Sequence, residues 1–91
     1  MNRRHVKTLD SIFKVPPPSN VTWNDCEKLL LALGAEISEG EGSRVRIVLS
    51  GVKAVFHRPH PRKEVDRGAL VSLRKFMENA GVMPEEKTNE I

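Results

Sequence analysis

Two short runs of alternating apolar and polar residues, 44–49 and 52–57, flank a Ser-Gly dipeptide at 50–51. A two-residue connection of this kind predicts a tight β-hairpin, and no other part of the chain constrains the fold as strongly. In that register Arg44 lies opposite His57, and all the apolar residues except two valines share one face. A shift by one residue would bury the arginines, so the register is strongly specified.

Helical patterns lie on both sides of this hairpin. Apolar residues recur at helical spacing in 23–33, where Gly34 ends the helix, and in a second helix that Asp66 caps and Gly81 ends. Residues 35–39 alternate as a short strand. The order α-β-β-β-α predicts an α+β fold with a three-stranded antiparallel sheet and two helices on one face, which is the topology of double-stranded-RNA-binding domains.

The chain is expected to have three segments. Residues 1–20 form an N-terminal arm, with a short helical turn at 8–13 and an extended spacer at the three prolines 16–18. Residues 21–82 form the folded domain, and 83–91 form an acidic, flexible tail. The apolar edge of the arm packs either on the domain or on a partner subunit, and the sequence leaves both open.

Basic residues are concentrated in the middle of the chain. Residues 1–43 have five Lys or Arg against six Asp or Glu, 44–75 have nine against two, and 76–91 have one against four. A basic middle between neutral and acidic flanks is typical of a surface that binds nucleic acid or an acidic protein. A charge run by itself is equally typical of a solvated surface.

The composition also excludes several classes of protein. The single cysteine, Cys26, excludes an intrachain disulfide and falls on the buried stripe of the first helix, where it reads as a small buried hydrophobe. No Cys/His spacing predicts a zinc site, and no apolar run is long enough to cross a membrane. We therefore expect a cytoplasmic protein that needs no metal, cofactor or membrane.

The stretch between the hairpin and the second helix, 57–68, contains two of the three histidines, His57 and His60. Prolines 59 and 61 fix the backbone and remove amide donors, so this stretch should be a stiff loop that presents its side chains to solvent. A rigid, cationic, histidine-bearing loop suits a phosphate-rich ligand.

Several motifs of this chain follow one another in a known order. They are the helix before Gly34, the Gly42-Ser43 connection, the hairpin, the pattern His60-x-x-Lys63-Glu64-x-x-x-Gly68, and a helix that ends in Asn79-Ala80-Gly81-Val82. Over about residues 22–82 the sequence resembles the HicA family of toxin ribonucleases. The resemblance implies a small fold like that of a double-stranded-RNA-binding domain and metal-independent cleavage of messenger RNA. It also implies neutralisation by a HicB-like antitoxin that covers the active site.

One position departs from the family pattern. The catalytic motif of the family, Gly-Ser-His at the start of the second strand, reads Gly42-Ser43-Arg44 here. An arginine cannot accept a proton at any relevant pH, so the base of the family cannot be carried over to this residue.

Metal-free RNA cleavage needs a base for the 2′-hydroxyl proton, an acid for the leaving oxygen and cations for the charged phosphorane. We hypothesise that His57 or His60 transfers the proton, because histidine titrates near neutral pH and His57 is predicted opposite Arg44. The basic residues predicted to bind RNA are Arg44, Arg46, Lys53, Arg58, Arg62, Lys63 and Arg67.

Two functions from different classes fit these residues. The first is a toxin endoribonuclease of a type II toxin–antitoxin system that cleaves messenger RNA. The second is a catalytically inactive module on the same fold that binds RNA or an antitoxin, which Arg44 in the position of the base favours. Turnover of RNA separates them.

Overall fold

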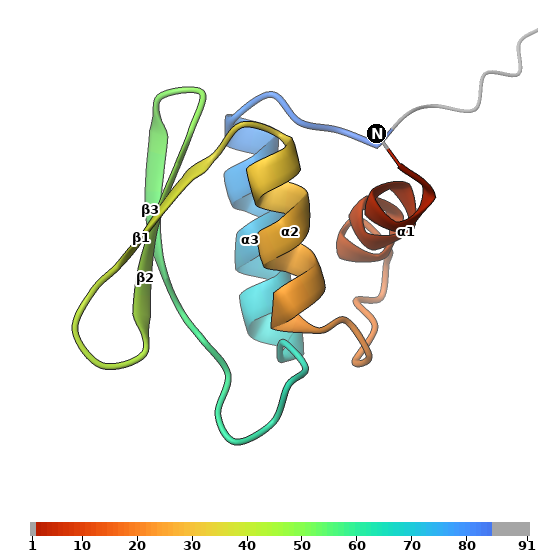
Figure 1. Ribbon diagram of the computed structural model, residues 1–91. Coiled ribbons are helices and arrows are strands. Elements are labelled where there is room, and N and C mark those ends of the chain that lie inside the picture. Colours follow the sequence, from red (N-terminus) through yellow and green to blue (C-terminus); the bar gives the residue numbers. More distant parts are fainter. Residues whose placement is uncertain (1, 85–91) are drawn as a thin grey trace, which may run out of the picture.

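The computed structural model describes residues 2–84, which form three helices and a three-stranded sheet (Figure 1). In chain order the elements are α1 (Arg3–Ile12), α2 (Trp23–Ala32), β1 (Glu36–Glu39), β2 (Arg44–Leu49), β3 (Val52–His57) and α3 (Arg67–Asn79). The fold is therefore α+β, as predicted, with one helix added before the expected α-β-β-β-α order.

The sheet is antiparallel with the strand order β1-β2-β3. The β2–β3 register is the predicted one, with Arg44 opposite His57. Ser50 has a φ of 52° and Gly51 a φ of 80°. Positive φ at both central residues is the conformation that matches the twist of two strands joined by a two-residue turn. The Ser-Gly dipeptide therefore fixes the hairpin.

The hydrophobic core lies between the sheet and the pair α2 and α3, which cover one face of it (Figure 1). Phe56 of β3 lies close to an aromatic ring of each helix, with ring centroids 6.3 Å from Trp23 of α2 and 5.9 Å from Phe76 of α3. The other buried core residues of the sheet and these two helices are Cys26, Leu29, Leu30, Val45, Ile47, Leu49, Leu70, Leu73 and Met77.

Side-chain caps fix where α2 and α3 begin. The hydroxyl of Thr22 accepts a hydrogen bond from the Asp25 amide at 3.2 Å, and the carboxylate of Asp66 accepts one from the Ala69 amide at 2.7 Å. Each bond satisfies an amide that has no partner within its helix. At the other end of α2, Gly34 has a φ of 96°, which glycine adopts without steric cost.

The helix α1 is longer than the short turn expected at residues 8–13. It begins after Asn2, whose side chain accepts a hydrogen bond from the His5 amide at 2.8 Å. The helix packs on α2 and α3 on the side away from the sheet and forms a third layer (Figure 1). Leu9 and Ile12 lie in the core. Of the two placements that the sequence left open, the segment thus docks on its own domain.

Part of the predicted acidic tail, residues 85–91, lies outside the described residues. Within 2–84, no helix has the length and apolar character required to cross a membrane.

Candidate functional site

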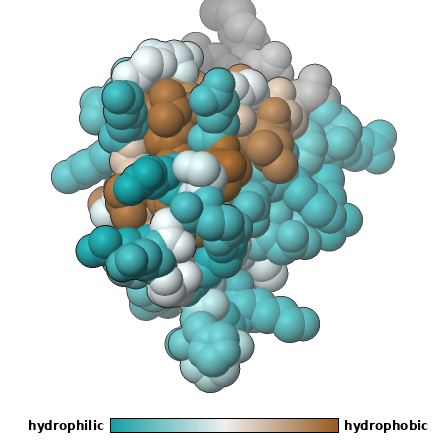
Figure 2. All heavy atoms as spheres, turned by 60° about the vertical axis from the view of Figure 1, so that its left-hand side comes forward, coloured by the Kyte–Doolittle hydropathy of each residue, from teal (hydrophilic) through white to brown (hydrophobic). Residues whose placement is uncertain are grey.

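The face of the sheet that the helices leave open is basic. Arg44 and Arg46 of β2 and Lys53 and His57 of β3 are all exposed on it. Val55 lies among them with 54% of its surface exposed. Figure 2 turns this side of the molecule forward and shows apolar surface bordered by hydrophilic side chains. The surface therefore combines cations with an exposed apolar patch.

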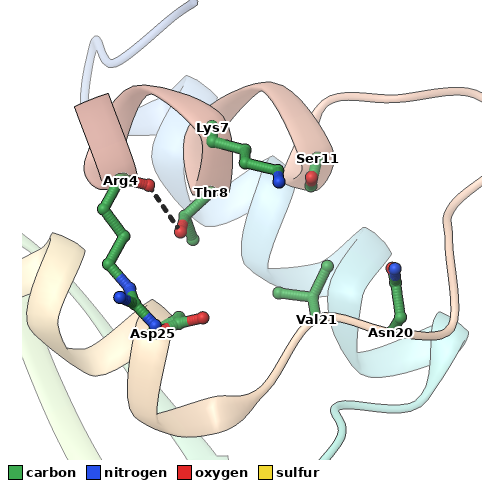
Figure 3. Close-up of a pocket in the computed structure, with 7 residues that line it drawn as sticks. All are labelled: Arg4, Lys7, Thr8, Ser11, Asn20, Val21 and Asp25. Carbon is green, nitrogen blue, oxygen red and sulfur yellow. Dashed lines mark hydrogen bonds and ion pairs between the residues drawn. The ribbon is translucent and has the colours of Figure 1, made fainter.

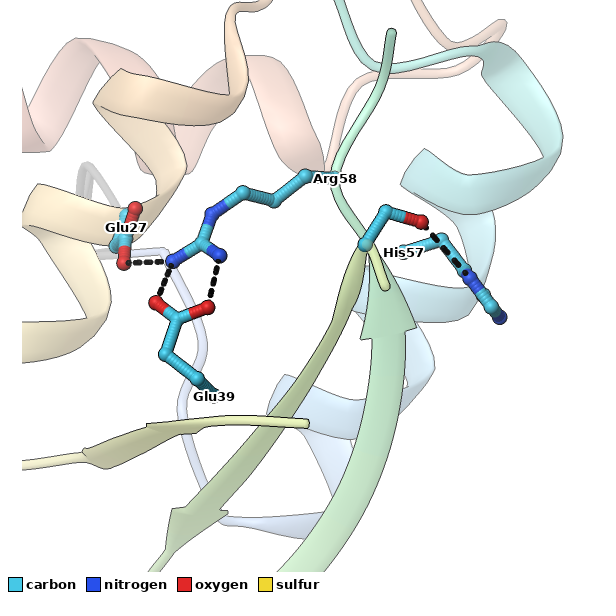
Figure 4. A network of polar contacts seen from close by, with 5 residues as sticks. Glu27, Glu39, His57 and Arg58 are labelled. Atoms are coloured by element: carbon cyan, nitrogen blue, oxygen red, sulfur yellow. Dashed lines mark hydrogen bonds and ion pairs between the residues drawn. The ribbon is translucent and has the colours of Figure 1, made fainter. Parts of the chain in front are cut away.

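At one end of this face, Ser43 and His57 contact each other. The Ser43 Oγ lies 3.4 Å from His57 Nδ1, a long hydrogen bond between two exposed residues (Figure 4). Ser43 directly precedes β2 and His57 ends β3, so the antiparallel register brings them together. The bond occupies Nδ1 and leaves Nε2 as the ring nitrogen for another partner.

Arg44 lies directly opposite His57 in the β2–β3 ladder. Together with Arg46 and Val55 it lines a surface cavity of about 570 Å³. Glu39 and Glu41 line the same cavity, so its cations face two carboxylates. Arg58 neutralises the Glu39 carboxylate, so Arg44 and Arg46 share this cavity with a single carboxylate, that of Glu41, that has no ion pair within residues 2–84.

Arg58 points away from His57, toward α2 and β1 (Figure 4). Its two terminal nitrogens donate to the two Glu39 oxygens at 2.6 Å and 2.8 Å, and Nη2 also donates to Glu27 Oε2 at 3.2 Å. The hydrogen bond from Arg58 holds the pKa of Glu39 below its ordinary value, and the Glu39 and Glu27 carboxylates raise the pKa of Arg58. Unlike the other predicted RNA-binding cations, Arg58 is thus committed to a structural ion pair.

Backbone hydrogen bonds fix the loop between β3 and α3 at both ends. The Arg58 amide donates to the Ser43 carbonyl at 2.9 Å, and the Val65 amide donates to the Val21 carbonyl at 2.8 Å. Between these two bonds, the Lys63 carbonyl accepts from the Trp23 amide at 3.0 Å. The loop therefore has a defined position next to the start of α2.

The remaining predicted residues lie apart from the Ser43–His57 contact. His60, Arg62 and Lys63 are exposed on the loop, and Arg67 is exposed at the first position of α3. Within the described part of the chain, His60 makes no side-chain hydrogen bond, so His57 is the histidine that the fold joins to the Gly-Ser-Arg motif.

The sequence did not assign a role to Ser43 or to the two carboxylates that bind Arg58. Ser43 belonged to a recognised motif, and the hairpin register already placed it one step beyond the Arg44–His57 pair, so its contact with His57 could have been found. The carboxylates that hold Arg58 could not, because Glu27 and Glu39 are 31 and 19 residues away from it and only the folded chain brings them together.

Cys26 is excluded as a nucleophile. Its side chain is fully buried, and this burial, with a smaller contribution from the Asp25 charge, raises the pKa of the thiol to about 12. A buried thiol with such a pKa stays protonated and unreactive at neutral pH. Within residues 2–84, no group of three or more His, Cys, Asp or Glu side chains is arranged to hold a metal ion.

Comparison with known protein families gives a match over most of the folded domain. The family described as HicA toxin of bacterial toxin–antitoxin systems matches residues 23–82, which include α2, the whole sheet and α3. Comparison with curated proteins and with solved structures finds no significant match. The matched region is more than half of the chain and has the three-stranded sheet and two covering helices expected of this family. The chain therefore belongs to the HicA toxin family of bacterial toxin–antitoxin systems.

Proposed function

We propose that this toxin is a metal-independent endoribonuclease that cleaves messenger RNA and uses His57 in place of the family's histidine. The observation that carries the proposal is the placement of His57, which lies opposite Arg44 and in contact with Ser43 at the exposed end of a basic sheet face. Arg44, which the resemblance places at the position of the family's base, is thus the direct cross-strand neighbour of His57.

In the proposed reaction His57 Nε2 accepts the proton of a 2′-hydroxyl. The 2′-oxygen then attacks the adjacent phosphorus and the bond from phosphorus to the 5′-oxygen breaks, which leaves a 2′,3′-cyclic phosphate, and the 5′-oxygen takes up a proton from water. In this proposal Nδ1 carries the ring proton and donates to Ser43 Oγ across the 3.4 Å contact, so that the unprotonated Nε2 faces the substrate. His60 remains the second candidate for proton transfer, from the loop that follows β3.

The proposed role of Arg44 and Arg46 is to bind the phosphate. A guanidinium offers fixed, parallel donors to two phosphate oxygens and cannot lose its charge as the phosphorane forms. Both side chains are exposed on the same face as His57. Lys53, Arg62, Lys63 and Arg67 are exposed as well and are proposed to hold phosphates further along the RNA.

The alternative is a module that binds RNA, or the antitoxin, without cutting. Arg44 favours it, because an arginine in the family's base position removes the original proton acceptor. Membership in a toxin–antitoxin family implies an antitoxin in either case, and the proposed antitoxin is HicB-like and covers the basic sheet face.

The test is incubation of the purified chain with a mixed messenger RNA in EDTA. The parent is expected to cleave the RNA, and His57→Ala is expected to lower the rate about a hundredfold or more, as loss of a general acid–base group does. His60→Ala in the same assay decides whether the second histidine contributes.

His5→Ala is the matched control, because His5 lies on α1 and outside the proposed site. Full activity of His57→Ala would contradict the proposal. No cleavage by the parent, together with activity gained by Arg44→His, would identify the chain as an inactive binding module on a toxin fold.

A further inference from the structure

The helix α1 precedes the region that matches the family, 23–82, yet it is built into the fold. Leu9 and Ile12 anchor it in the core, and Thr8 Oγ1 donates to the Arg4 carbonyl at 3.0 Å. The exposed side of the same helix carries Arg4 and Lys7. The fold therefore holds in place a helix outside the family region, and this helix carries two exposed basic side chains.

Arg4 and Asp25 line each of two neighbouring cavities, and Lys7 lines the first of them. The first cavity, of about 380 Å³, lies between α1 and the segment that leads into α2 (Figure 3). In this view Arg4 extends toward Asp25, and Lys7 lies farther along the same helix. The second cavity, of about 470 Å³, lies between Arg4 and the loop that carries Arg62 and Lys63.

The linings of both cavities are strongly basic. Asp25 is the single acidic residue among the described lining residues, against five basic ones, which are Arg4, Lys7, Arg58, Arg62 and Lys63. Of these five, Arg58 is neutralised by Glu27 and Glu39. Arg4 touches Asp25 only through Nε at 3.4 Å, and 72% of its side chain is exposed. Within residues 2–84, Lys7, Arg62 and Lys63 form no ion pair.

The second cavity lies along the loop that follows His57 in the chain. Arg58, Pro59 and Pro61 of this loop line it. Arg62, Lys63 and Arg4 line this second cavity, and Arg4 and Lys7 line the first, so basic residues follow one another from the loop to α1. A row of cations in adjoining cavities fits a chain of phosphates rather than one isolated anion, because each phosphate of an RNA strand meets a separate cation.

We propose that α1 extends the RNA-binding surface of this toxin, with Arg4 and Lys7 holding phosphates of a single-stranded RNA that continues from the cleavage site across the loop. This inference rests on the proposed function, because it takes RNA as the substrate. The helix α1, which lies outside the family region, thus takes a direct part in RNA binding. We expect it to increase the affinity for long RNA and to make this affinity depend more steeply on salt.

The test uses the full chain with His57→Ala as background, so that bound RNA stays intact. Binding of a fluorescein-labelled, unstructured RNA is measured over a series of salt concentrations, with and without Arg4→Gln and Lys7→Gln combined. The double substitution is expected to weaken binding about tenfold, as loss of two exposed charge contacts does, and to reduce the salt slope by about 1.4, since each contact with single-stranded RNA adds about 0.7.

Arg3→Gln and Lys14→Gln combined are the matched control. Both residues are exposed and line neither cavity, so this control removes the same two charges without the proposed contacts. Thermal unfolding of all variants checks that α1 stays packed. An equal effect of this control and of the Arg4 and Lys7 double substitution would overturn the inference, because the effect would then come from net charge alone.

Three further outcomes decide the matter. Unchanged RNA affinity of the double variant would overturn the inference and leave the cleavage result standing. Lost affinity for a co-expressed antitoxin with unchanged RNA affinity would also overturn it, in favour of a protein-binding role for α1. Weakened RNA binding in a parent that cleaves no RNA would support the inference and overturn the proposed reaction.

Discussion

Arg58 holds Glu39 through two parallel hydrogen bonds, from Nη1 to Oε1 at 2.6 Å and from Nη2 to Oε2 at 2.8 Å. Nη2 also reaches Glu27 on α2, so that one guanidinium joins the end of β3 to β1 and to the helix layer. Arg58 directly follows His57 in the chain. The ion pair therefore fixes the backbone that carries the proposed proton acceptor.

Replacing Arg58 by lysine should lower the free energy of unfolding by about 1 kcal/mol, the upper end for an exposed ion pair. The reason is geometry, because an ammonium group cannot make two parallel hydrogen bonds to one carboxylate. Urea unfolding measures the change. Arg46→Lys is the control, since Arg46 is exposed and has no ion pair within residues 2–84, and an equal loss in both variants would contradict this prediction.

The same pair predicts how stability changes in acid. The hydrogen bond from Arg58 lowers the pKa of Glu39 from its ordinary value of 4.5. A carboxylate whose pKa is lower in the folded state stabilises the fold at pH values above the ordinary pKa, and this contribution disappears as the pH falls through the folded value.

The difference in stability between the parent and Glu39→Gln should therefore be largest near neutral pH and should shrink below about pH 4.5. Urea unfolding at a series of pH values measures it. A difference that stays constant down to strongly acidic pH would show that the charge of Glu39 is not what stabilises the fold.

The hairpin and the Arg44–His57 pair differ from α1 in how far the sequence could predict them. The period of two and the Ser-Gly turn determine the β2–β3 register, and that register alone places Arg44 opposite His57. The start of α1 carries only weak signals, because residues 3–8 are mostly polar and the helix start is marked by Asn2 as a capping residue and by Val6 three positions before Leu9. The Arg58 ion pair was also beyond prediction, because its direction depends on carboxylates from two other elements.

Ile12 tests whether α1 is an integral layer of the fold. Its side chain is only 1% exposed, in contact with the core, so Ile12→Ala should lower the free energy of unfolding by about 3 kcal/mol through lost burial and a residual cavity. Thermal or urea unfolding measures this. Asp10→Ala on the exposed side of the same helix should have a small effect, and equally small effects of both would mean that α1 does not stabilise the core.

Ser43→Ala tests whether the hydroxyl group orients His57. Without the Oγ acceptor, Nδ1 no longer has a fixed partner, so the ring samples both tautomers and presents the unprotonated Nε2 less often. The kcat for RNA cleavage should fall about tenfold, part of what general acid–base catalysis contributes, while KM stays unchanged. Ser43→Thr keeps the hydroxyl and should restore most of the rate. Because Ser43 is exposed, neither variant should change the unfolding midpoint, so a loss of kcat that threonine reverses must arise at the histidine.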